Sequence, residues 1–209
     1  MQKVLLSFVF ILTICGFGFS QAGKLKAYID QKTYYAPNSG TYVELQSQFV
    51  GYTLHYDTVG SALQSKVAVA ALITSSTGDT VARDIYVLQS PLMRDSIIED
   101  FFDIQRIPLK PGNYKAHIEL QDLLSQNESL TGMIEIEVPE INKQIAMSDI
   151  LIAEVATPST VDSPFNKSGY EIIPRISNFY GQGLNNLPYY VELYNTNTHI
   201  DTVFGFKQR

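Results

Sequence analysis

The stretch Asn113-Tyr-Lys-Ala-His-Ile-Glu-Leu-Gln121 alternates apolar and polar residues along its whole length. A period of two with one apolar face is typical of a half-buried β-strand. Pro111-Gly112, directly before it, is a turn signal. Residues 130–138 repeat the alternation, with Glu135 and Glu137 on the polar side. The two stretches therefore predict a β-hairpin, with residues 121–129 as its loop.

Similar short apolar or alternating stretches follow one another along the rest of the chain. Further strands are expected at residues 25–30, 42–49, 67–73, 80–88, 98–107, 150–155, 170–176, 189–194 and 203–206. Residues 67–73 are almost continuously apolar, which predicts a central strand buried on both faces. No stretch of helical length shows a clean helical period. The sequence therefore predicts an all-β fold, an antiparallel β-sandwich of the Ig-like or macroglobulin-like kind, followed by a second, incomplete β module.

The tetrapeptide Tyr42-Val43-Glu44-Leu45 recurs as Tyr190-Val191-Glu192-Leu193. One strand used twice would look like this, so the repeat predicts two related β modules. We expect a sandwich domain at 21–138, a linker at 139–147 and the second module at 148–209. The second module has about four strands where such a sandwich usually has ~7, so we expect it to be truncated or completed by a partner. Both glutamates fall on polar strand faces and are expected to be solvated.

The N-terminus carries Lys3, an apolar run at 4–19 and a small-x-small sequence ending at Ser20. This order predicts a signal peptide at 1–20, and export to the periplasm, the outer membrane or the exterior. The alternatives are a buried N-terminal strand or an uncleaved anchor, although the run is shorter than the ~20 apolar residues of a membrane span. Lipid attachment at Cys15 is disfavoured, because Ile14 stands where a lipoprotein signal has a small residue.

Cysteine content and charge exclude several classes of function. Cys15 is the only cysteine, so cleavage after Ser20 leaves none for disulfides, thiol chemistry or thiolate-bound metal. The net charge is -6, removal of Lys3 makes it one unit more negative, and no Lys/Arg cluster occurs. Binding to nucleic acid or anionic lipid is therefore disfavoured. We expect a protein or envelope-glycan partner, no cofactor, and no transmembrane segment in the mature chain.

Several short motifs occur in a characteristic order. They are Leu25-Lys26-Ala27-Tyr28-Ile29-Asp30, Tyr35-x-Pro37, Tyr42-Val43-Glu44, Ser148-Asp149-Ile150, Asn166-Lys167-x-Gly169-Tyr170-x-Ile172-Ile173-Pro174 and Tyr189-Tyr190-Val191-Glu192-Leu193-Tyr194-Asn195. Together they resemble the N-terminal region of the GWxTD-domain proteins exported by Bacteroidetes-type bacteria. The resemblance implies an envelope protein with β-sandwich modules ahead of a C-terminal domain, and no established catalytic activity. The chain contains no Trp, so the motif that names the family is absent.

No set of residues predicts a catalytic, cofactor or metal site. His55, His117 and His199 lie far apart in the sequence, without ligand spacing. The group Glu99, Asp100 and Asp103 has oxygen ligands for calcium but lacks the Gly-containing loop of a specific site. A Gly-x-Ser-x-Gly elbow and a phosphate-binding loop are both missing. We therefore predict that the chain is not an enzyme.

Two surface features have alternative interpretations. Four Asp-Ser/Thr-aliphatic triplets look like the O-glycosylation signal of exported Bacteroidetes proteins, or else are turns entering strands; they place candidate sites at Thr58, Thr80, Ser96 and Thr202. Tyr34 and Tyr35 are candidates for an aromatic ligand surface, with cross-strand packing as the favoured alternative.

The function expected from these observations is a non-catalytic scaffold or binding role in the cell envelope. The alternatives are a carbohydrate-binding or carbohydrate-active accessory module, and an N-terminal fragment of a larger envelope protein. A reading frame that continues past Arg209 into Gly-Trp-x-Thr-Asp would establish the fragment.

Overall fold

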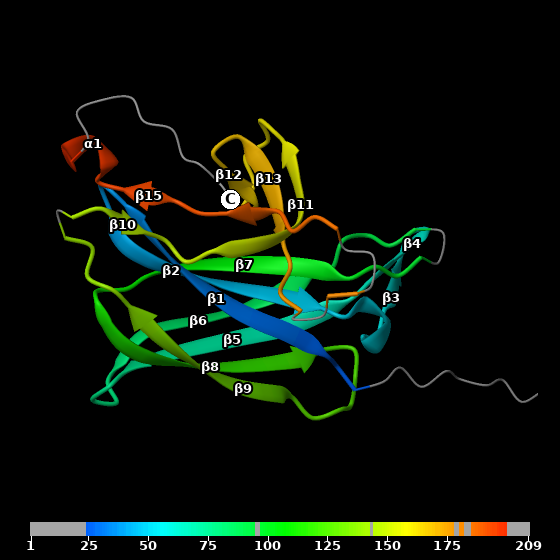
Figure 1. Ribbon diagram of the computed structural model, residues 1–209. Coiled ribbons are helices and arrows are strands. Elements are labelled where there is room, and N and C mark those ends of the chain that lie inside the picture. The colour runs from blue at the N-terminus through cyan, green and yellow to red at the C-terminus, as the bar shows by residue number, and fades with distance from the viewer. Residues whose placement is uncertain (1–23, 95–96, 143, 178–179, 182–184, 200–209) are drawn as a thin grey trace, which may run out of the picture.

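The computed structural model describes residues 24–94, 97–142, 144–177, 180–181 and 185–199 and is built almost entirely of antiparallel β-sheet (Figure 1). A three-stranded sheet has the order β1-β2-β7, with β1 at Ala27–Ala36, β2 at Gly40–Phe49 and β7 at Phe101–Pro108. A four-stranded sheet has the order β6-β5-β8-β9, with β5 at Lys66–Ser75, β6 at Thr80–Gln89, β8 at Gly112–Asp122 and β9 at Leu130–Val138. The predicted all-β, sandwich-like fold class is confirmed.

The two sheets enclose one hydrophobic core. Val43, Leu45 and Phe49 of β2 are buried in it with the inward side chains of β5, β7, β8 and β9. The rings of Phe49 and Phe101 stack with centroids 5.0 Å apart. On β8, Ala116, Ile118 and Leu120 alternate with exposed polar residues, as the period of two predicts. Burial of this apolar surface is the main force that holds the sandwich together.

Small elements close one end of the sandwich. The 3₁₀ helix η1 (Gly51–Thr53) and the hairpin of β3 (Asp57–Val59) and β4 (Ala62–Gln64) lie between β2 and β5 in the sequence. Gly51 allows a close approach here, because a Cβ would come within 2.2 Å of the Glu99 carbonyl oxygen. The sequence predicted none of these elements, since each has only three residues.

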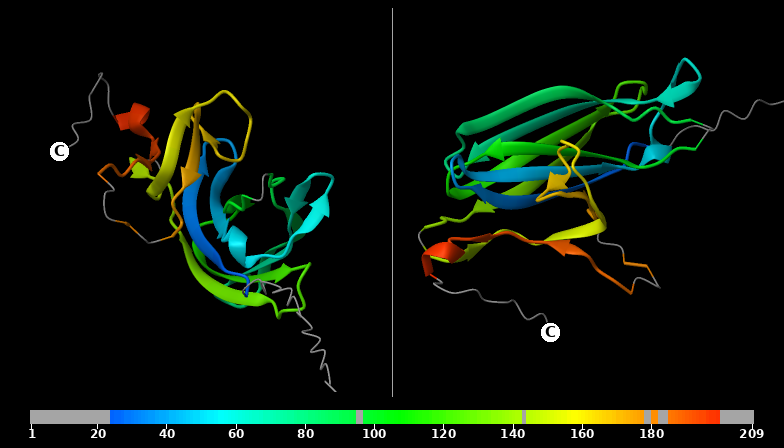
Figure 2. Two further views of the ribbon diagram at one scale, coloured as in Figure 1. Left: turned by 90° about the vertical axis from the view of Figure 1, so that its right-hand side faces the viewer. Right: turned by 90° about the horizontal axis from the view of Figure 1, so that it is seen from above.

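The second module lies on the side of the β1-β2-β7 sheet that faces away from the four-stranded sheet (Figure 2). Its main sheet has the order β12-β13-β11-β14, and a separate pair joins β10 to β15. The bounds are β10 Ala146–Met147, β11 Leu151–Pro158, β12 Asn166–Lys167, β13 Tyr170–Pro174, β14 Tyr189–Tyr190, β15 Leu193–Tyr194 and α1 Thr196–His199. Leu151, Ala153 and Ile172 form its small core. Within the described residues, the helices are all too short or too polar to cross a membrane.

Several sequence expectations need correction. The predicted strand at 189–194 is broken into β14 and β15, so the repeated tetrapeptide is a continuous strand only in its first copy. Part of the expected linker, β10, pairs with β15. The central strand β5 is buried on one face only, with Ala68, Ala70 and Leu72 partly exposed on the other. The predicted strand at 203–206 lies outside the described residues.

Candidate functional site

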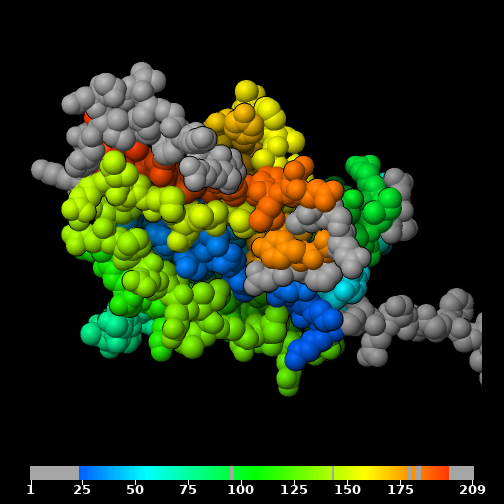
Figure 3. All heavy atoms as spheres, viewed as in Figure 1, coloured from blue at the N-terminus to red at the C-terminus, as the bar shows by residue number. Residues whose placement is uncertain are grey.

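The outer face of β2 is buried beneath the second module. Tyr42, Glu44 and Gln46 point away from the sandwich core, where the sequence predicts solvated side chains, yet Glu44 and Gln46 have no exposed surface. Figure 3 shows the second module lying directly against the blue strand β1, the neighbour of β2. The expectation of a solvated Glu44 is therefore wrong, because a second layer of protein replaces water on that face.

Glu44 is the centre of a buried charge cluster. Its Oε1 accepts hydrogen bonds from Lys167 Nζ at 2.8 Å and from Arg106 Nε at 2.9 Å, and its Oε2 accepts one from Gln46 Nε2 at 3.3 Å. Arg106 is the cross-strand partner of Glu44 on β7, and it also donates to the Pro164 carbonyl oxygen at 2.8 Å. A buried carboxylate is tolerated only when it is paired and hydrogen-bonded in this way.

Lys167 reaches Glu44 from the second module. It ends β12, and the two-residue turn Ser168-Gly169 connects it to Tyr170 of β13. Both turn residues have positive φ, 52° and 83°, as a type I′ hairpin requires. The Lys167 side chain is only 4% exposed. The tight hairpin thus fixes the base of the lysine side chain and aims it into the sandwich face.

Aromatic rings surround the lysine ammonium group. Lys167 Nζ lies 4.0 Å from the centroid of the Tyr34 ring and 5.6 Å from that of Tyr190. Tyr34 stacks on Tyr42 with centroids 5.6 Å apart. A cation held against ring faces out of water gains a further favourable interaction. The second module therefore docks through a lysine that is paired with a carboxylate and enclosed by tyrosines.

Glu192, the glutamate of the second repeat copy, belongs to the same junction. It accepts hydrogen bonds from the hydroxyl groups of Tyr190 at 2.7 Å and Tyr194 at 2.8 Å. The Tyr194 hydroxyl oxygen in turn accepts one from the Tyr35 backbone N–H at 3.0 Å. The backbone N–H of Glu192 donates to Ser148 Oγ at 2.9 Å. Both repeated glutamates therefore take part in joining the modules, and Glu192 is partly buried rather than solvated.

The edge of β1 is covered by the start of the second module. The Thr33 N–H donates to Asp149 Oδ2 at 2.7 Å, and the Asp149 N–H donates to the Thr33 carbonyl oxygen at 3.2 Å. An exposed strand edge offers unpaired backbone groups to other chains. These contacts satisfy part of that edge within the molecule.

Burial shifts the acid–base equilibria of the junction. It raises the pKa of Tyr34 far above the usual tyrosine value, and it raises the pKa of Tyr42 to about 12, with Glu44 adding to both effects. Burial lowers the pKa of Lys167, and the attraction of Glu44 opposes that change. The Tyr34 and Tyr42 hydroxyls therefore stay protonated to a higher pH than an exposed tyrosine, and the carboxylate of Glu44 is occupied by three donors. The arrangement suits a structural joint better than proton transfer to a substrate.

The two tyrosines predicted as a ligand surface lie inside this junction. Tyr34 has no exposed surface, so its assignment to a ligand surface is wrong and the packing alternative applies. Tyr35 is partly buried, with its ring edge-on to that of Tyr194 at 5.5 Å. The second module covers both positions, which the sequence of the first module could not indicate.

The structure does not bring the other candidate residues together. His55 Nδ1 lies 2.8 Å from Asp122 Oδ2, His117 is exposed on β8, and His199 ends α1. Asp100 accepts the Gly51 N–H at 3.0 Å, whereas Asp103 accepts the Tyr86 hydroxyl. Among the described residues, no group of three or more potential metal ligands occurs.

The candidate glycosylation sites divide into two pairs. Thr58, in the β3–β4 hairpin, and Thr80, at the start of β6, are exposed. Ser96 and Thr202 lie outside the described residues.

Comparison with known proteins does not assign a function to this site. No family model and no curated protein matches the chain. Among solved structures, a protein assigned as ApaA from Bordetella pertussis aligns with 57% of this chain and 99% of its own, at 9% sequence identity and a TM-score of 0.33. A likeness this distant carries no argument about function.

Proposed function

We propose that the chain is an exported, non-catalytic scaffold or binding protein of the cell envelope, whose two β modules act as one rigid unit. The observation that carries this proposal is the Glu44–Lys167 pair, which has almost no solvent contact and lies between the modules. This buried ion pair thus joins two structural layers and does not line an open cleft.

The chemistry of the pair supports a fixed arrangement of the modules. A buried ion pair requires good geometry, because each charge loses its hydration and only attraction and hydrogen bonds within the protein compensate for that loss. Here the partners are 123 residues apart in the sequence. Any sliding of the second module would separate Lys167 from its carboxylate and leave Glu44 with only Arg106 and Gln46 of the first module. The modules are therefore expected to keep one relative orientation, as a spacer or mounting surface requires.

The carbohydrate-binding alternative has lost its most specific support. It rested on Tyr34 and Tyr35 as an exposed aromatic strip, and Tyr34 is fully buried. If the alternative held, a glycan array would show selective binding that Tyr35→Ala removes. The scaffold proposal expects no selective binding on such an array.

Cell fractionation tests export and location. The full chain with a C-terminal tag is produced in a Bacteroidetes host and followed by mass spectrometry. We expect the processed chain, beginning at Gln21, in the envelope or medium. A full-length chain that stays in the cytoplasm would refute the proposal.

A further inference from the structure

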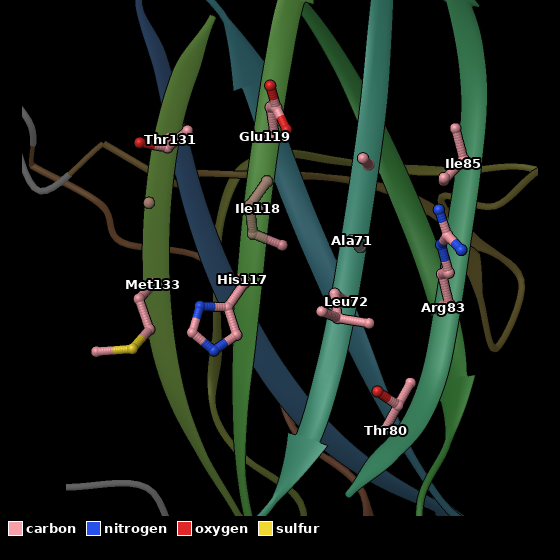
Figure 4. A pocket seen from close by; sticks show the side chains of 12 residues that line it. Ala71, Leu72, Thr80, Arg83, Ile85, His117, Ile118, Glu119, Thr131 and Met133 are labelled. Carbon is pink, nitrogen blue, oxygen red and sulfur yellow. The ribbon is translucent and has the colours of Figure 1, made fainter. Parts of the chain in front are cut away.

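The outer face of the four-stranded sheet, on the far side of the sandwich from the junction, exposes apolar side chains. Ile85 is 57% exposed, Val87 54% and Met133 55%. Together with Ala70 and Leu72 of β5, Ile85 and Met133 border a shallow hollow of about 840 Å³ (Figure 4). A broad apolar surface of this kind typically marks an interaction site.

The register of the strands arranges this face in cross-strand rows. One row runs Arg83–Leu72–His117–Met133, and the next runs Ile85–Ala70–Glu119–Thr131. Figure 4 shows the two rows side by side across β6, β5, β8 and β9. Each row thus contains an apolar half on β6 and β5 and a polar half on β8 and β9, apart from Arg83 and Met133.

The two rows are complementary to each other under a two-fold rotation. Consider an axis that lies in the plane of contact, perpendicular to the strands and between the rows. Rotation about it places Leu72 of one copy opposite Ala70 of the other, so a large side chain meets a small one. It also places His117 opposite Glu119, and each contact occurs twice. An isologous interface requires this kind of self-complementarity.

The distribution of charges over the whole face also favours a second copy of the chain as the partner. Arg83 and Lys115 share it with three glutamates, which are Glu119, Glu135 and Glu137, and His117 lies among them. A face of mixed sign suits a copy of itself better than a strongly basic or acidic partner.

The size of the face is sufficient for a modest interface. Four strands spaced by about 4.8 Å, with eight or nine residues each at about 3.3 Å, give roughly 500–600 Å² for each copy. The total of roughly 1,100 Å² lies at the lower end of specific protein interfaces. Reversible self-association in the micromolar range is the corresponding expectation.

We propose that a second copy of this chain docks on the outer face of the β6-β5-β8-β9 sheet, forming a two-fold dimer in which His117 of each copy pairs with Glu119 of the other. This inference does not rest on the proposed function, because the junction with the second module occupies the opposite side of the sandwich.

A charge swap tests the proposal. Sedimentation equilibrium is measured on the purified full-length processed chain from about 1 to about 300 μM. Wild type should form dimers. Glu119→Lys removes the carboxylate opposite His117, and His117→Glu places two carboxylates opposite each other, so each should raise the dissociation constant about tenfold. The double variant again places a basic side chain opposite a carboxylate, with the two positions exchanged, and should return to within about threefold of wild type.

The controls separate dimerisation from folding. Glu128→Lys makes the same charge change on the exposed loop between β8 and β9 and should behave as wild type. Circular dichroism melting curves of all variants should coincide at the lowest concentration, where the monomer predominates, because His117 and Glu119 are exposed on the monomer. A wild-type monomer at every concentration, or a dimer that the single variants leave unchanged, would overturn the proposal. So would a double variant as weak as the single ones. A monomer that instead binds a peptide or glycan on this face would assign the surface to another partner.

Discussion

Replacing Lys167 by methionine measures how much the buried ion pair contributes to the free energy of unfolding. Methionine keeps most of the side-chain volume against Tyr34 but removes the charge that lies 2.8 Å from Glu44 Oε1. Removing one partner of a buried ion pair typically costs 3–5 kcal/mol. Arg106 stays bonded to the same oxygen of Glu44, so part of the charge compensation remains. That part is limited, because the Arg106 side chain is 46% exposed and water screens its interaction. We therefore expect a loss of about 2–3 kcal/mol in the free energy of unfolding.

The companion variants define how much of that loss is pairwise. Glu44→Met alone should cost a similar amount, because Lys167 then stays buried without a carboxylate. The double variant Glu44→Met/Lys167→Met should lie within about 1 kcal/mol of wild type, because two apolar side chains of similar volume replace the pair. The resulting coupling energy is expected to be at least about 3 kcal/mol. Lys110→Met, at an exposed lysine, is the matched control and should change stability by less than about 0.5 kcal/mol.

The assay is urea unfolding at pH 7, followed by far-UV circular dichroism and by tyrosine fluorescence, since the chain contains no Trp. Midpoints and slopes of the two signals show whether the modules unfold together. The reasoning is refuted if Lys167→Met costs less than about 0.5 kcal/mol. Single-variant losses that simply add in the double variant would refute it as well, because the pair would then have no energy of its own.

Three further outcomes follow from the same structure. Among the described residues, burial raises the pKa of six tyrosines, that of Tyr42 to about 12, so between pH 10 and their folded-state values the unfolded chain binds fewer protons. The free energy of unfolding should therefore fall as the pH rises above 10, and the lowered pKa of Lys167 makes a smaller contribution of opposite sign. About half of the tyrosinate absorbance should appear only on unfolding. Titration of all 13 tyrosines together near pH 10 in the folded protein would contradict this. Tyr194→Phe should cost about 1–2 kcal/mol in the same urea assay, because it removes the donor to Glu192 and the acceptor for a β1 backbone amide, and a change below about 0.3 kcal/mol would argue against the bonds. If the Asp-Thr-aliphatic sites carry glycans, the intact mass of protein from a Bacteroidetes host should exceed that of the polypeptide and fall with Thr58→Ala and Thr80→Ala, whereas the bare mass would reject glycosylation.

The sandwich could be predicted from the sequence because its signals are local. The alternation at Asn113–Gln121 determines which side chains enter the core, and the structure follows it residue by residue. The strands of the second module were harder to predict. They are as short as two residues, and their stability comes from docking on the first module rather than from their own pattern.

The junction could not be predicted, because its polar residues have the pattern of a solvated strand face. Glu44 and Gln46 alternate with core residues as surface side chains do, and only a layer contributed more than 100 residues later buries them. Lys167 gives no local signal beyond the short Ser168-Gly169 turn that follows it. For β5 the sequence predicted too much burial, since Ala68, Ala70 and Leu72 are apolar but partly exposed. An apolar strand with one open face is consistent with the proposed dimer.

The claim that the two modules form one rigid unit is tested most directly by residual dipolar couplings of the backbone amides in solution. We expect one alignment tensor to fit the amides of the described residues within 27–138 and 146–194 together, and Lys167→Ala to separate the set into two tensors or to weaken the alignment of the second group. Two different tensors in the wild-type protein would contradict the account, because the Glu44–Lys167 junction would then not hold the modules in a single orientation.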